Sequence, residues 1–218
     1  MAIIHKTTVT PSKLELLTAW LPAQPWYLGP EGEPDLTRAG GFRLDDPAGE
    51  VGIEFMVVTD GSGDQVAAYL VPLTYRAGAL DGGEGALIGT TEHGVLGRRW
   101  VYDGIRDPVL VAELAALARG EAEPQAQSVS NTPDPTVIVT PVTGGGTGDQ
   151  VAVRINRVLR SGEDGRTGAG ESAPAEGSRG SAGAAPTGPA WQPCLSATWR
   201  RPDGTLARGV FALAQLQA

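Results

Sequence analysis

The sequence predicts an α+β fold in which antiparallel strands form most of the structure and helices flank them. Three observations support this prediction. Runs of apolar and β-branched residues alternate with short turns rich in Gly and Asp, which is typical of hairpins. Two segments combine helix caps with apolar residues at helical spacing. A further set of strands follows residue 135, so we expect a second, smaller antiparallel sheet.

Two helices are expected, one near the N-terminus and one ending close to residue 120. Ser12 begins the first, because a glutamate follows it at capping-box spacing, and Pro22 ends it. Asp107, followed directly by proline, begins the second, and Gly120 ends it. Both segments therefore have defined boundaries.

The strands of the first part follow the first helix. A short helical turn is expected at 35–39, before these strands begin. Residues 51–59 are almost all apolar and predict a central strand, and 66–75 predict its hairpin partner. Pro72 inside that partner indicates an edge or a bulge, because proline has no N–H to donate. Shorter strands are expected at 86–90 and 95–103.

The second part of the chain predicts two more hairpins. Residues 136–143 are expected to pair with 149–160 around a Gly-rich turn, and 191–201 with 205–216. Between the two hairpins, residues 161–190 hold eight Gly and seven Ala but no aromatic residue and no Val, Ile, Leu or Met. Such a segment buries too little apolar surface to offset the entropy of ordering it, so we expect a disordered insertion.

These features divide the sequence into two modules. We expect a first module at 1–120, a linker rich in Pro, Gln and Ser at 121–135, and a β module at 136–218 that carries the insertion 161–190.

Composition limits the possible partners and compartments. The 218 residues carry a net charge of −8 and no basic cluster, which argues against nucleic acid and anionic membranes as partners. A single cysteine, Cys194, cannot form an internal disulfide. The sequence has no signal-peptide pattern and no apolar run of membrane-spanning length. We therefore expect a soluble, cytoplasmic protein.

The first 120 residues resemble the N-terminal cap domain of actinobacterial maltokinases. The matching segments read LTAWLP and PWYLG within Leu17–Gly29, YLVPLTYR at Tyr69–Arg76, IGTTEHG at Ile88–Gly94 and VYDGIRDPVLVAELAAL at Val101–Leu117. The resemblance implies a curved antiparallel sheet with flanking helices, seated on the N-lobe of a kinase.

The rest of the chain is similar to the kinase N-lobe that follows this cap. Ser130, Asn131 and Thr132 resemble the Ser-Asn-Thr segment of the phosphate loop, and Val151–Arg160 resembles the strand with the ATP-positioning lysine. Arg154 stands where that lysine is expected, and its planar head is not equivalent to an ammonium group. The resemblance thus implies that these four residues are candidate nucleotide-binding residues.

The resemblance assigns no catalytic residue. A kinase needs an aspartate that orients the acceptor hydroxyl and acidic groups that hold magnesium, and both come from a C-lobe that the sequence does not contain. We therefore expect no cofactor, with ATP binding only if another chain supplies a C-lobe. No spacing of His, Cys or acidic residues indicates a metal site.

Three functions are compatible with these observations. The first is a non-catalytic cap-like protein that binds a protein partner, such as a glucan-pathway enzyme, or regulates maltose, trehalose or α-glucan metabolism. The second is a subunit of a split sugar kinase, completed by a partner chain that carries the C-lobe. The third is a carbohydrate-binding module, supported by Trp26, Trp100, Trp191 and Trp199 as possible stacking residues.

Acidic pairs offer a further route to catalysis. Asp45 and Asp46 are adjacent, and Asp103 lies four positions before Asp107. Paired carboxylates could serve glycoside chemistry. Turn formation and helix capping explain the same residues, and we expect these structural roles.

Overall fold

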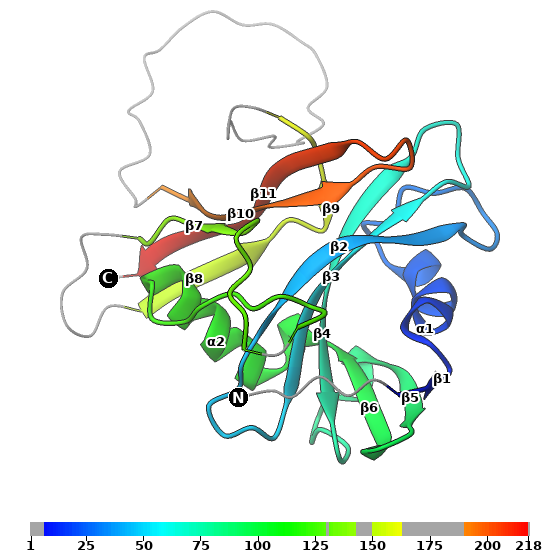
Figure 1. The fold of residues 1–218 in the computed structure, drawn as a ribbon, viewed down its shortest axis with the longest axis horizontal. Coiled ribbons are helices and arrows are strands. Elements are labelled where there is room, and N and C mark those ends of the chain that lie inside the picture. The colour runs from blue at the N-terminus through cyan, green and yellow to red at the C-terminus, as the bar shows by residue number, and fades with distance from the viewer. Residues whose placement is uncertain (1–6, 130, 143–149, 163–189, 218) are drawn as a thin grey trace, which may run out of the picture.

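The computed structural model describes residues 7–129, 131–142, 150–162 and 190–217, and within them the strands form one antiparallel sheet (Figure 1). The strands are β1 (Val9–Thr10), β2 (Leu36–Leu44), β3 (Gly52–Asp60), β4 (Ala67–Arg76), β5 (Leu87–His93), β6 (Gly97–Asp103), β7 (Ile138–Val139), β8 (Gln150–Ile155), β9 (Val158–Leu159), β10 (Gln192–Arg200) and β11 (Leu206–Gln217). Their order is β1-β5-β6-β4-β3-β2-β10-β11-β8, with β7 beside β10 and β9 beside β4.

Both predicted helices are confirmed. Helix α1 (Lys13–Trp20) begins at Ser12, whose hydroxyl accepts a hydrogen bond from the Glu15 amide, and the Glu15 carboxylate accepts one from the Ser12 amide. Helix α2 (Pro108–Arg119) begins at Asp107 and ends at Gly120, which adopts the left-handed conformation at φ 77°. Short 3-10 turns lie at η1 (Leu21–Ala23), η2 (Glu84–Ala86) and η3 (Gly104–Arg106).

The two helices pack on opposite faces of the central strands. On β3, Phe55 and Val57 belong to the cluster that includes Leu110 of α2, while Met56 and Val58 pack with Leu17 of α1. Successive side chains of a strand point to opposite faces, so each helix covers one of them. This two-sided cover explains why the segment that forms β3 is almost entirely apolar, as the sequence indicated.

Strands of the second part of the chain continue the sheet of the first. Trp199 of β10 pairs with Gly40 of β2, and the rings of Phe42 and Phe211 lie 6.5 Å apart. Phe42 also stacks on Phe55, with centroids 4.5 Å apart. The sequence predicted two sheets, whereas the described residues form one sheet with a shared core. The boundaries 1–120, 121–135 and 136–218 stay a prediction.

Pro72 lies at a gap in strand pairing on one side of β4. Residues Ala68 and Tyr69 of β4 pair with β9, and pairing with β6 begins only at Leu73. Pro72 therefore removes no ladder hydrogen bond on that side, although β4 is an interior strand. The predicted edge or bulge is therefore absent, because β4 lies between β6 and β3 and pairs with β3 without a register shift.

Two local predictions are wrong. Residues 35–39 do not form a helical turn, because β2 begins at Leu36, which pairs with Asp60 at the end of β3. The segment 136–143 does not pair with 149–160. Instead β7 pairs with β10, while β8 forms six residue pairs with β11. The longer ladder with β11 satisfies more backbone groups than β7 could.

The predicted disordered insertion at 161–190 lies outside the described residues except for its first two positions and its last. The Gly-rich turn at 144–148 also lies outside them. The remaining hairpin, between 191–201 and 205–216, is confirmed as β10 and β11.

Candidate functional site

Asn131 and Thr132, two of the three candidate phosphate-loop residues, lie in a turn that is closed by a backbone hydrogen bond. Asn131 is exposed and left-handed at φ 52°, and the Thr132 carbonyl accepts a hydrogen bond of 2.7 Å from the Ala126 amide. Ser130 lies outside the described residues. Proline at 133 forms a bridge with Gln125, which in turn pairs with Arg43 of β2. The turn thus packs on the edge of the cap sheet.

Arg154 lies elsewhere, on the exposed side of β8. It stands opposite Leu213 of β11, and its guanidinium carbon is 5.4 Å from the centroid of the Trp191 ring. This distance is typical of a cation–π contact. Arg154 thus contacts Trp191, whereas Asn131 and Thr132 belong to the turn that packs beside β2. Nucleotide binding by these residues stays a prediction.

The segment 121–135 holds a buried carboxylate in place. The amide of Gln127 donates a 3.0 Å hydrogen bond to Oε1 of Glu54, and Arg38 Nη2 donates one of 2.7 Å to Gln127. A side chain at Gly41 would collide with this arrangement, because its Cβ would lie 2.7 Å from Nε2 of Gln127. The same Cβ would also lie 1.9 Å from the Phe55 carbonyl oxygen. Glycine is therefore required here on steric grounds.

Glu54 is ionised in this cluster although it is buried. Burial alone would raise the pKa of Glu54, but the ammonium group of Lys13 and a 2.8 Å hydrogen bond from Tyr75 outweigh it and lower the pKa. The same environment raises the pKa of Tyr75 well above its usual range, through burial and the Glu54 charge. The cluster joins α1, β3, β4 and the segment 121–135 as one structural unit.

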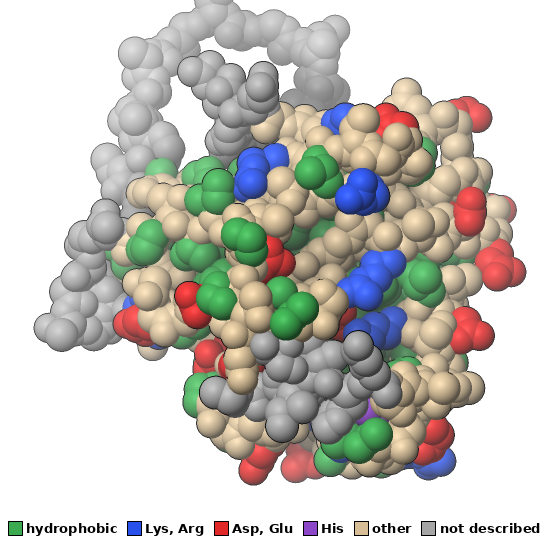
Figure 2. All heavy atoms as spheres, viewed as in Figure 1, with side chains coloured by type: hydrophobic (Ala, Val, Ile, Leu, Met, Phe, Trp, Pro, Cys, Tyr) green, Lys and Arg blue, Asp and Glu red, His purple; other side chains and the backbone are tan. Residues whose placement is uncertain are grey.

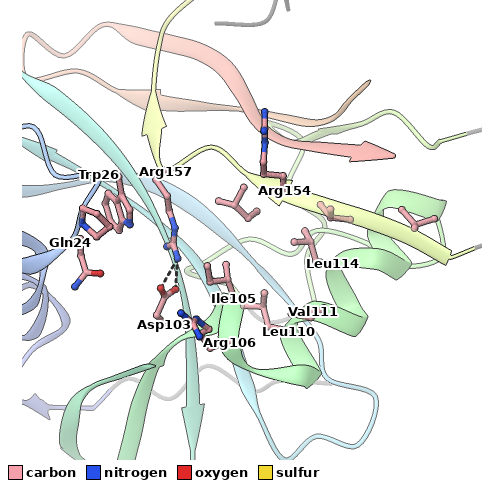
Figure 3. Close-up of a pocket in the computed structure, with 14 residues that line it drawn as sticks. Gln24, Trp26, Asp103, Ile105, Arg106, Leu110, Val111, Leu114, Arg154 and Arg157 are labelled. Atoms are coloured by element: carbon pink, nitrogen blue, oxygen red, sulfur yellow. Dashed lines mark hydrogen bonds and ion pairs between the residues drawn. The ribbon is translucent and has the colours of Figure 1, made fainter. Parts of the chain in front are cut away.

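A cavity of about 500 Å³ lies between α2, β8 and the corner that follows α1 (Figure 3). Its apolar lining residues come from α2, η3 and β8: Ile105, Leu110, Val111, Leu114, Val151, Val153 and Ile155. Its polar lining residues are Gln24, Asp103, Arg106, Arg154 and Arg157, with Pro25 and Trp26 beside Gln24. The cavity thus joins an apolar wall to a wall that contains charged groups.

An ion pair between Arg157 and Asp103 forms the charged wall. Arg157 Nη2 lies 2.7 Å and 2.6 Å from the two carboxylate oxygens of Asp103, and the two side chains are 10% and 12% exposed. The guanidinium carbon lies 5.0 Å from the centroid of the Trp26 ring. Among the described residues, Nη1 of Arg157 is buried without a hydrogen-bond partner.

The acidic pairs weighed for glycoside chemistry have structural roles. Asp107 caps α2 and forms two hydrogen bonds with Arg76, at 2.7 Å and 2.6 Å. Asp103 binds Arg157, and Asp46 accepts three backbone hydrogen bonds from the turn that follows it. The expected turn role of Asp46 and capping role of Asp107 are confirmed, whereas Asp103 forms an ion pair instead of a cap.

Three of the four tryptophans of the proposed platform have different surroundings, and the fourth, Trp100, lies in β6. Trp199 is 4% exposed and packs against Phe211 in the core. Trp191 contacts Arg154, and Trp26 packs edge-on against Trp20 and lines the cavity. Trp26 therefore both packs against the end of α1 and lines the candidate site.

The sequence offered no local signal for the Arg157–Asp103 pair. These residues are 54 positions apart, and the sequence analysis considered Asp103 only beside Asp107. The break between β8 and β9, which places Arg157 next to β4, brings them together. Only the pairing of distant strands reveals this wall of the cavity.

The described residues offer neither a metal site nor a membrane-spanning helix. No group of three or more His, Cys, Asp or Glu side chains in this part of the chain could hold a metal ion. Within the same residues, no helix has the length and apolar character needed to cross a membrane. On the face shown in Figure 2, Lys and Arg side chains are interspersed with other types and form no continuous basic stripe.

The fold is an antiparallel sheet with two flanking helices, and a cavity of about 500 Å³ lies beside α2 and β8. Residues 20–107 match the family model of the maltokinase N-terminal cap domain. This part of the chain, from the end of α1 to the N-cap of α2, is therefore similar to the maltokinase N-terminal cap domain, as its motifs indicated. No curated protein matches the chain.

Proposed function

We propose that this chain is a non-catalytic cap-like protein that binds a protein partner or regulates an enzyme of maltose, trehalose or α-glucan metabolism. The metabolic assignment rests on the maltokinase cap match at residues 20–107. The partner is an enzyme of that metabolism, which a cap of this type would contact through its outer surface.

One observation carries the non-catalytic part of the proposal. The groups that resemble a nucleotide site are engaged in structural contacts: Arg154 lies on the Trp191 ring, and the turn at 126–132 is closed by its own backbone. The same segment supplies Gln127 to the buried Glu54 cluster. These contacts support a structural role for this segment, which packs against the cap sheet, and not the role of a phosphate loop.

A second candidate function is the subunit of a split sugar kinase. The observation that favours it is the single sheet, in which β8, β10 and β11 are fixed to the cap strands rather than tethered by a linker. Such a rigid platform could receive a catalytic lobe from another chain. Arg154, exposed on β8, would then be free to exchange Trp191 for a phosphate.

Two experiments on the full chain separate these functions. In the first, the purified protein is incubated with ATP and with maltose or glucose, and phosphorylated sugar is measured; we expect none. In the second, the tagged protein is recovered from cells and co-purifying proteins are identified. An enzyme of glucan metabolism supports the first proposal, whereas a kinase C-lobe together with ATP-analogue binding supports the second.

Phosphorylation by the purified chain alone would contradict both proposals. The carbohydrate-binding alternative is tested in parallel by titrating the protein with maltooligosaccharides and following tryptophan fluorescence. Because Trp199 is in the core and Trp26 contacts Arg157, we expect no saturable change. A saturable change would favour a carbohydrate-binding module instead.

A further inference from the structure

We propose that the cavity between α2, β8 and Trp26 binds a small organic anion, composed of an oxyanion group on an apolar body. Short-chain carboxylates and phosphate monoesters share this chemistry. The proposal concerns a small ligand and does not depend on the protein partner proposed above. It rests on the charge, the unpaired donor, the apolar wall and the size of the cavity.

The lining of the cavity has an excess of positive charge. Arg157 is neutralised by Asp103 at 2.6 Å. Arg106, which follows Asp103 in η3, is exposed and forms no ion pair with any of the described residues. Arg154 is also a lining residue, but Figure 3 shows its side chain directed away from the other labelled residues. Arg106 thus leaves one uncompensated charge beside the Arg157–Asp103 pair.

Arg157 also offers an unused hydrogen-bond donor. Its side chain is 10% exposed, and Nη1 has no acceptor among the described residues, while Nη2 serves both oxygens of Asp103. A buried N–H without an acceptor is costly, and such groups in native proteins usually find a partner. An oxyanion at this wall would accept from Nη1 and from Arg106, since guanidinium groups suit carboxylate and phosphate oxygens.

The opposite wall requires an apolar ligand body. Leu110, Val151 and Val153 line it, and two further apolar side chains, Ile105 and Val111, are 38% and 49% exposed. Exposed apolar side chains gathered at a cavity mark a binding surface more often than singly scattered ones. A neutral sugar, with hydroxyls around its ring, would leave many of those hydroxyls unpaired against this wall.

The size of the cavity fits a small molecule. A volume of about 500 Å³ lies within the range of roughly 300–1,000 Å³ typical of sites that enclose most of a small ligand. The walls come from α2, β8 and the η1 corner, which are held by the sheet and by the Arg157–Trp26 contact at 5.0 Å. The site therefore needs no rearrangement of strands in order to form.

The test uses the full chain labelled with ¹⁵N and four probes. Hexanoate and hexyl phosphate present the two oxyanions on the same apolar chain, hexanol presents the chain alone, and maltose is a neutral sugar. The indole N–H signal of Trp26, identified as the one lost in Trp26→Phe, reports on the cavity directly. We expect saturable shifts with at least one anion and none with hexanol or maltose.

Three variants test the assignment of the walls. Arg106→Gln removes the uncompensated charge and is expected to weaken anion binding roughly tenfold, a usual effect of losing one charge-assisted contact. Arg208→Gln is the matched control, because Arg208 is an exposed arginine of β11 outside the lining. Val111→Trp fills the apolar side with all arginines intact and is also expected to weaken binding.

The outcomes decide the proposal as follows. Tighter binding of hexanoate assigns the site to carboxylic acids, and tighter binding of hexyl phosphate assigns it to phosphate monoesters. The proposal fails if neither anion saturates the Trp26 signal, or if hexanol binds as well as the anions. It also fails if Arg106→Gln and Arg208→Gln bind with equal affinity.

Discussion

The side-chain amide of Gln127 donates a 3.0 Å hydrogen bond to the buried carboxylate of Glu54, 73 positions earlier in the chain. This contact fixes the segment 121–135 to the central strand of the cap. The sequence predicted that segment as a linker between modules, yet Gln125 pairs with Arg43 of β2 and Gln127 binds Glu54 of β3. We therefore expect the stability of the protein to depend on this contact.

The first prediction concerns Glu54 itself. Glu54→Gln keeps the shape of the side chain but removes its negative charge. The carboxylate forms an ion pair with Lys13 and accepts a hydrogen bond from the Tyr75 hydroxyl. Because the carboxylate is 5% exposed, we expect the free energy of unfolding to fall by about 1–3 kcal/mol. Urea denaturation followed by circular dichroism measures the change.

Glu92→Gln is the matched control for this measurement. Glu92 also binds an arginine, Arg98 at 2.8 Å, but its side chain is 59% exposed. Exposed ion pairs contribute less than about 1 kcal/mol, so the control is expected to change little. Equal losses in the two variants would contradict the structural role assigned to the Glu54 cluster.

Local patterns were sufficient to predict many of the elements. The caps of α1 and α2 were recognised because Ser12 and Asp107 act on amides within three residues of themselves. The strand β3 was recognised because burial on both faces makes it apolar throughout. Turn chemistry likewise placed the β10–β11 hairpin.

Pairing between distant strands could not be predicted in the same way. Residues 136–143 and 149–160 are neighbours in sequence and have similar apolar patterns, so a hairpin was the simplest expectation. The structure pairs β8 with β11 because that ladder is longer, and β7 with β10. The cavity depends on this arrangement, because the pairing of β8 with β11 positions the chain that leads to Arg157, which binds Asp103.

The second prediction follows from the shared core. Phe211 of β11 is fully buried and lies 6.5 Å from Phe42 of β2. Truncation by Phe211→Ala is expected to cost about 3–5 kcal/mol, because it removes a ring and leaves a cavity. Unfolding should remain a single transition, with tryptophan fluorescence and circular dichroism curves that coincide.

Leu206→Ala on the same strand provides the control, because Leu206 is 64% exposed and should contribute less than about 0.5 kcal/mol. Two separate transitions in the unaltered protein, with Phe211→Ala shifting just one of them, would mean that residues 1–120 and 136–218 fold as independent modules. Coincident curves would instead mean that the one sheet unfolds as a unit.

The third prediction concerns alkaline pH and Cys194. Burial raises the pKa of the Cys194 thiol from 9.0 to about 11. The unfolded chain therefore loses this proton at lower pH than the folded protein does. The contribution of the buried thiol to the free energy of unfolding is fully present below pH 9 and is lost as pH rises towards 11. This loss should destabilise the protein by roughly 1–2 kcal/mol.

Cys194→Ala removes this titration and should reduce the loss of stability between pH 9 and 11, as measured by urea midpoints at each pH. A residual slope is expected, because the pKa of Tyr75 is also raised by burial and by the charge of Glu54. If the variant and the original protein lose stability in parallel across this range, the thiol is not buried in the folded state.

The fourth prediction concerns acidic pH and the cap of α2. Burial opposes ionisation of Asp107, but the hydrogen bonds from Arg76 and Val109 outweigh it and lower the pKa of Asp107 below 3.8. The ionised Asp107 carboxylate contributes to the free energy of unfolding above pH 3.8, and this contribution is lost as pH falls through the folded-state pKa. Asp107→Asn can still cap Val109 but loses the ion pair, at an expected cost of about 1–3 kcal/mol at pH 7.

The difference in unfolding free energy between Asp107→Asn and the original protein should therefore shrink as pH is lowered from 7 to about 3, because protonation gives the original protein the same neutral side chain. Glu121→Gln serves as control, since its pair with Arg119 is exposed and should contribute less than about 1 kcal/mol at any pH. A difference that stays constant with pH would mean that Asp107 acts through its cap alone and that Arg76 gains nothing from the charge.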